Sequence, residues 1–160
     1  MKKTTMVLAI AMMSILLVGL ASAQPYTETA TQTFNLSVAS IYKISVSGDP
    51  GDMTIDDAVP GSDPTPVTDN STTYSITHND ADGAKITASL APALAAGYTL
   101  EIALNGGAAV DISTLAQDAV ANVARGASAG NSIVYTFSAE ADAGPMSSTS
   151  ETVTLTVVGL

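Results

Sequence analysis

Hydrophobic and polar residues alternate along much of the chain beyond residue 33. A period of two places the apolar side chains on one face of a β-strand and the polar ones on the other. Seven segments follow this pattern, and their apolar positions are Phe34, Leu36 and Val38; Tyr42, Ile44 and Val46; Tyr74 and Ile76; Ile86, Ala88 and Leu90; Tyr98, Leu100, Ile102 and Leu104; Ile133, Tyr135 and Phe137; Val153, Leu155 and Val157. Residues 53–55 form a short eighth candidate. The pattern predicts a protein built of strands.

Turn-forming residues separate these segments. Gly, Asn, Asp and Pro cluster at residues 48–51, 79–83, 105–107 and 144–145, and three prolines between residues 59 and 70 predict an extended surface loop. Short strands at regular spacing, each with one polar face, predict an all-β fold: an antiparallel β-sandwich of the immunoglobulin-like type with seven to nine strands. A closed barrel would give the same alternation.

One segment does not fit the strand pattern. Residues 113–125 are rich in alanine, begin with Ser113 as a potential N-cap and are followed by Gly126. These features favour a helix. Val120 and Val123, however, make only a thin apolar stripe. We therefore predict a short helical crossover that leads into a strand.

The N-terminus has the pattern of an export signal. Lys2 and Lys3 precede an apolar run over residues 6–20, and the small residues 21–23 follow. This predicts a signal peptide of residues 1–23 that is cleaved, although a retained anchor is the alternative. Residues 24–160 then form one β-sandwich domain with an N-terminal arm, residues 24–32. We expect it to be secreted or displayed at the cell surface, with no membrane insertion after cleavage.

Composition narrows the range of functions. The 160 residues include 5 Lys+Arg and 15 Asp+Glu, for a formal charge of −10. Nucleic-acid binding needs clustered cations, so this acidic balance argues against it. There is no cysteine, which excludes cysteine nucleophiles and disulfides. His78 is the only histidine, and its place at a strand end predicts an exposed loop position. We expect a protein that is not an enzyme.

Aspartates are the only candidates for residues that bind a cofactor, and the cofactor would be calcium. Asp80 and Asp82 have the alternate spacing of part of a calcium loop, but His78 and Ser89 stand where that loop needs acidic residues. Asp80 and Asp82, or a second group, could still form a looser calcium site. The second group consists of Asp52, Asp56 and Asp57. Hairpin turns account for the same residues without a metal, and we prefer that interpretation.

Two terminal segments carry a family resemblance. Tyr26 to Gln32 resembles the donor arm of secreted β-sandwich pilins, and Thr152 to Val158 resembles their closing strand. The chain lacks the cysteine pair of the commonest such subunits. The resemblance implies a fimbrial subunit with a role in cell adhesion, whose partners are copies of itself or a related surface protein.

The arm consists of Tyr26, Thr27, Glu28, Thr29, Ala30, Thr31 and Gln32. Its threonines favour an extended strand, which pairs either within its own sandwich or with another subunit. The leading hypothesis is an extracellular structural or adhesive subunit that assembles by β-strand donation into filaments or a surface layer. The alternative is a monomeric secreted module that binds a glycan or a surface protein.

Overall fold

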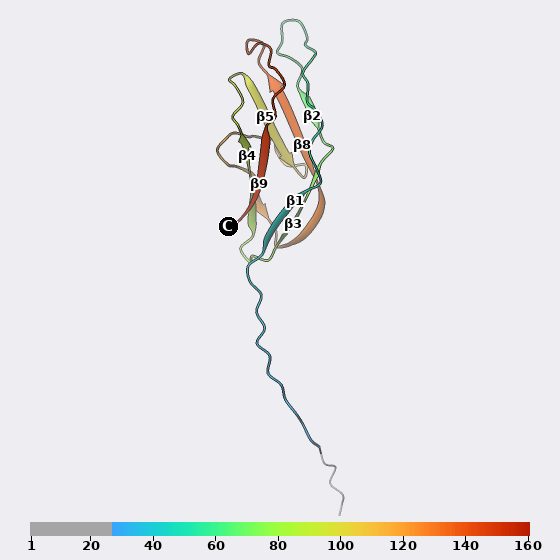
Figure 1. The fold of residues 1–160 in the computed structure, drawn as a ribbon, viewed down its shortest axis with the longest axis vertical. Coiled ribbons are helices and arrows are strands. Elements are labelled where there is room, and N and C mark those ends of the chain that lie inside the picture. Colours follow the sequence, from blue (N-terminus) through green and yellow to red (C-terminus); the bar gives the residue numbers. More distant parts are fainter. Residues whose placement is uncertain (1–26) are drawn as a thin grey trace, which may run out of the picture. The chain divides into compact units, whose positions relative to one another are not determined.

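The computed structural model describes residues 27–160, and all of its strands lie beyond residue 41. The chain divides into two units, residues 1–37 and 38–160. Nine strands form two antiparallel sheets in the second unit (Figure 1). No described residue is helical, so this part of the chain contains no helix that could cross a membrane. The predicted signal peptide lies outside the described residues.

The larger sheet has six strands, in the order β1-β3-β8-β5-β6 with β2 also paired to β8. Its strands are β1 (Tyr42–Val46), β2 (Val67–Asp69), β3 (Thr73–His78), β5 (Tyr98–Leu104), β6 (Val110–Asp111) and β8 (Gly126–Ala139). The smaller sheet has the order β7-β4-β9, formed by β4 (Ala84–Ala91), β7 (Gln117–Val123) and β9 (Thr152–Gly159). The predicted all-β sandwich is confirmed.

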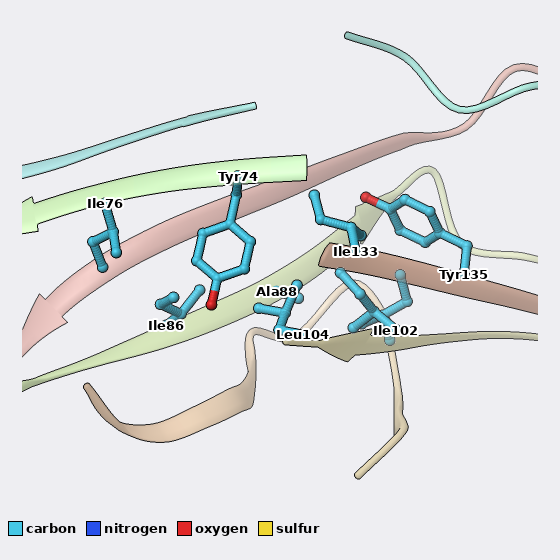
Figure 2. Packing of buried hydrophobic residues seen from close by; sticks show 9 residues of the cluster. Tyr74, Ile76, Ile86, Ala88, Ile102, Leu104, Ile133 and Tyr135 are labelled. Atoms are coloured by element: carbon cyan, nitrogen blue, oxygen red, sulfur yellow. The ribbon is translucent and has the colours of Figure 1, made fainter. Parts of the chain in front are cut away.

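The core lies between the two sheets. Tyr74 and Ile76 of β3 face Ile86 and Ala88 of β4, and Leu104 of β5 reaches the same layer (Figure 2). Ile86 and Ala88 are fully buried. The alternation in the sequence therefore identified the inward face of these strands, because side chains two residues apart point to the same side.

Three local predictions were wrong. The helix predicted within residues 113–125 is instead β7, which pairs with β4 and is tied to it by an ion pair between Lys85 and Asp118 with a separation of 2.9 Å. Residues 53–55 form no strand. The proline-containing loop includes β2, which adds three residues to the edge of β8.

Strand β8 changes neighbours along its length. Its first part, Gly126 to Ser132, pairs with β3, while residues 133–139 pair with β5 on the opposite side. A bulge interrupts the β3 pairing near Gly130, whose φ of 68° is in the left-handed region that favours glycine. On the side toward β5, no strand of the described chain lies beside residues 126–131.

Candidate functional site

Two of the aspartates that suggested calcium, Asp80 and Asp57, act as hydrogen-bond acceptors. The Asp82 amide donates to Asp80 Oδ1 at 3.0 Å, and the Tyr42 hydroxyl donates to Asp80 Oδ2. These donors, with Tyr42 the larger cause, hold the pKa of Asp80 below its usual value. Asp57 accepts from the next amide, that of Ala58, at 2.8 Å.

The remaining calcium candidates are Asp52, Asp56 and Asp82, and all three are exposed. Within residues 27–160 the structure brings together no group of three or more His, Asp or Glu side chains that could hold a metal ion. Of the five candidates, Asp57 and Asp80 therefore have local hydrogen-bond donors as partners.

His78 is buried, and the predicted loop exposure was wrong. The side chain is only 2 % exposed. Its Nε2 lies 3.1 Å from the carbonyl oxygen of Val123 and 2.9 Å from that of Ala124. Because carbonyls only accept, Nε2 carries the hydrogen. The ring stacks on Tyr42 with an interplanar angle of 1°. His78 thus joins the end of β3 to the end of β7.

An exposed apolar segment precedes the sandwich. Phe34 is 73 % exposed, Leu36 is 91 % exposed and Val38 is 82 % exposed. The strand predicted here is not formed, because residues 33–38 belong to no ladder of the described chain. We call residues 33–38 the apolar segment. Its large side chains stand at alternate positions, as they would on one face of a strand.

The predicted donor arm comes directly before the apolar segment. Tyr26 lies outside the described residues together with residues 24 and 25, while residues 27–32 are exposed and form no strand. Sequence reasoning placed the donor function in this arm and the next residues in the core. One signal was available in the sequence: the alternating side chains Phe34, Leu36 and Val38 are strongly apolar, whereas neither face of the arm is.

A groove runs along one side of the sandwich between β7 and the first part of β8. It has a volume of about 470 Å³. Its lining includes buried core residues, Tyr74, Ile76 and Leu104, and half-buried residues of β7, Ala119, Val120 and Val123. All residues that line it are uncharged. The groove therefore borders the core, and polar residues (Asn105, Asn122, Ser128 and Asn131) also line it.

Both walls of the groove have strand edges that no other described segment covers. Within residues 27–160, β7 pairs only with β4, and residues 126–131 of β8 pair only with β3. β5 ends beside the next residue of β8, Ser132, whose carbonyl accepts a hydrogen bond from the Asn105 amide at 2.9 Å. Unpaired N–H and C=O groups on such edges can hydrogen bond to an added strand.

Comparisons with models of known protein families and with curated proteins gave no match to this chain.

Proposed function

We propose that this protein is an extracellular structural or adhesive subunit that assembles with copies of itself by β-strand donation. The observation that carries the proposal is the exposure of Phe34, Leu36 and Val38 at alternate positions of one segment. Isolated exposed apolar residues are ordinary, but a row of them at alternate positions of one segment is typical of a surface that meets a partner. The donated strand is accordingly the apolar segment, preceded by the threonine-rich arm.

The free energy available from such pairing is substantial. Burial of one large apolar side chain stabilises a contact by about 1.5–3 kcal/mol, and the apolar segment holds three of them. Main-chain hydrogen bonds of an added strand contribute to the same contact. The loss of freedom on association opposes both terms. The sum favours assembly most when all three side chains are seated together.

Two sequence features support a place outside the cell. The predicted signal peptide, residues 1–23, has a basic start, an apolar run and a small-residue end. The resemblance of Tyr26 to Gln32 and Thr152 to Val158 to parts of secreted pilins agrees with a fimbrial or surface-layer subunit. The buried position of His78, the only histidine, supports a role without catalysis.

The test compares two substitutions that add the same charge to the apolar segment. Leu36→Asp places a carboxylate on the apolar face, and Asn35→Asp places one on the opposite face. We expect the unmodified protein and Asn35→Asp to form oligomers in analytical ultracentrifugation, and Leu36→Asp to be monomeric. Equal melting temperatures of the three proteins would show that the fold is unaffected.

A strictly monomeric unmodified protein at high concentration would contradict assembly. Affinity of that monomer for a glycan or for a surface protein would then support the alternative, a secreted binding module.

A further inference from the structure

We infer that Arg125 of one copy docks into a pocket at the opposite end of the sandwich of a second copy. This inference rests on the proposed function, self-assembly, and adds a contact that is separate from the donated strand. The pocket, which we call the end pocket, has a volume of about 560 Å³. It is lined by residues 59 and 62–66 of the loop before β2, by residues 97 and 99 at the start of β5, and by residues 138–140 at the end of β8.

Hydrogen bonds hold the walls of the end pocket in place. The Thr65 amide donates to the Asp57 carbonyl at 2.9 Å, so the loop before β2 is closed on itself. Asp63 Oδ1 accepts from the Ala141 amide at 3.0 Å, which fixes this loop to the chain just beyond β8. A partner would therefore meet a preformed cavity, and less ordering would oppose its binding.

The lining of the end pocket favours a cation. Among the described residues that line it, only Asp63 and Glu140 are charged, and both are exposed. Val59 and Pro64 supply apolar surface beside them. An arginine side chain suits this combination, because its guanidinium group hydrogen bonds to carboxylates while its methylene stem packs on apolar surface.

Arg125 has the exposure that such a contact needs. It stands with Ala124 in the two-residue turn between β7 and β8, and its side chain is exposed. Within residues 27–160 the one ion pair joins Lys85 to Asp118, so Arg125 has no carboxylate partner in this part of the chain. His78 Nε2 donates to the Ala124 carbonyl and thereby holds the backbone of this turn.

Arg125 and the end pocket lie at opposite ends of β8. Arg125 directly precedes the first residue of this strand, and Glu140 directly follows the last (Figure 1). A strand of 14 residues spans about 45 Å, so the two groups cannot meet within one copy. A contact between opposite ends is heterologous, and it can repeat from copy to copy along a filament.

Charge is divided unevenly between the two ends. The cationic side chains of residues 27–160 are Lys43, Lys85 and Arg125. Lys43 and Lys85 are the second residues of β1 and β4. Both strands begin at the Arg125 end, because the first residue of β1 pairs with the last of β3, and the first residue of β4 pairs with the last of β7. The acidic end pocket of one copy therefore attracts the end of another copy at which the cations lie.

Charge reversal tests this contact in the full-length protein. Arg125→Glu and Glu140→Lys should each weaken self-association about tenfold in analytical ultracentrifugation at low ionic strength. Lys43→Glu is the matched control, because Lys43 is an exposed cation toward the same end but lies on a strand, and it should have a much smaller effect. A mixture of the Arg125→Glu and Glu140→Lys proteins should associate more tightly than either alone, because Arg125 of the second protein meets Glu140 of the first.

Disulfide cross-linking locates the contact, because the chain has no cysteine of its own. An Arg125→Cys protein is mixed with a differently tagged Thr65→Cys protein under mild oxidation. Leu115→Cys is the control for Thr65→Cys, because Leu115 is 74 % exposed but lies outside the end pocket. We expect Thr65→Cys to give most of the heterodimer.

The outcomes separate the possible failures. Equal effects of Arg125→Glu and Lys43→Glu, or a mixture that associates no better than its components, would overturn the Arg125 contact. Equal cross-linking of Thr65→Cys and Leu115→Cys would overturn the end pocket as the acceptor. In either case strand donation stands if Leu36→Asp abolishes assembly. If the unmodified protein does not self-associate, the proposed function fails together with this inference.

Discussion

His78 offers a quantitative test of what holds the end of the sandwich together. The imidazole is almost fully buried, stacks on Tyr42 and donates through Nε2 to the carbonyls of Val123 and Ala124. Its Nδ1 is also buried and has no hydrogen-bond partner. The side chain thus contributes both packing and hydrogen bonding, and two substitutions separate these contributions.

His78→Ala removes both contributions. Truncation of a large buried ring to alanine costs about 3–5 kcal/mol, through lost transfer free energy and the cavity left behind. The smaller size of imidazole favours the low end, so we expect a loss of about 3 kcal/mol. For a domain of this size that loss lowers the melting temperature by about 10 °C.

His78→Phe keeps a ring in the same place but removes the donor. Each lost hydrogen bond costs no more than about 0.5–1.5 kcal/mol. Ala124 is exposed, so a water molecule can replace His78 Nε2 as the donor to its carbonyl. Removal of the unpartnered Nδ1 relieves a desolvation penalty of about 1–3 kcal/mol. Because these effects oppose each other, we expect a net change within about 1 kcal/mol.

Urea unfolding followed by circular dichroism measures both variants, with stability taken from the midpoint and slope. The reasoning predicts a clear order, with His78→Phe close to the unmodified protein and His78→Ala far below it. If His78→Phe loses as much stability as His78→Ala, the bonds to Val123 and Ala124 hold the strand ends and packing does not, which would refute the argument.

Three further outcomes are expected. Tyr42→Phe removes the main cause of the low pKa of Asp80. A carboxyl group with a lowered pKa stabilises the fold at pH values above its ordinary pKa of 3.8, and this stabilisation is lost as the pH falls. Urea titrations should therefore show the largest difference in stability between the two proteins near pH 7 and a smaller difference in acid. Gly97→Ala should be more destabilising than Gly106→Ala in thermal melts, because a methyl group at Gly97 would lie 2.6 Å from Ala143 Cβ while one at Gly106 meets nothing within 4 Å, and both glycines have positive φ. Sodium chloride should raise the melting temperature of this acidic protein, and a large additional rise in micromolar calcium alone would contradict the assignment of its aspartates to turns.

The strands of the core were predictable because burial imposes a period of two on them. Ile86, Ala88 and Leu90 of β4, and Ile102 and Leu104 of β5, are all buried as the alternation required. Packing of these strands in two layers follows from the apolar faces, which must be buried against each other. The sequence could not show which strands are neighbours, because register and order depend on contacts between distant residues.

The failed predictions share a physical cause. Helix propensity within residues 113–125 is a weak local preference, and the pairing of β7 with β4 outweighs it. The alternation around Leu36 specifies an apolar strand face but not the chain that covers it. His78 was predicted to be an exposed loop residue because it stands at a strand end next to a turn, and only the fold brings the Val123 and Ala124 carbonyls to its ring.

The pairing of β4 with β9 has a consequence for the order in which this protein matures. Ala84 pairs with Gly159 and Ala91 with Thr152, so the central strand of the smaller sheet waits for residues that a ribosome makes much later. Until they emerge, one edge of β4 and the apolar face below it have no cover. Such distant pairing folds slowly, in milliseconds to seconds, and leaves an aggregation-prone intermediate. A holding chaperone would therefore act chiefly in the interval between synthesis of β4 and arrival of β9.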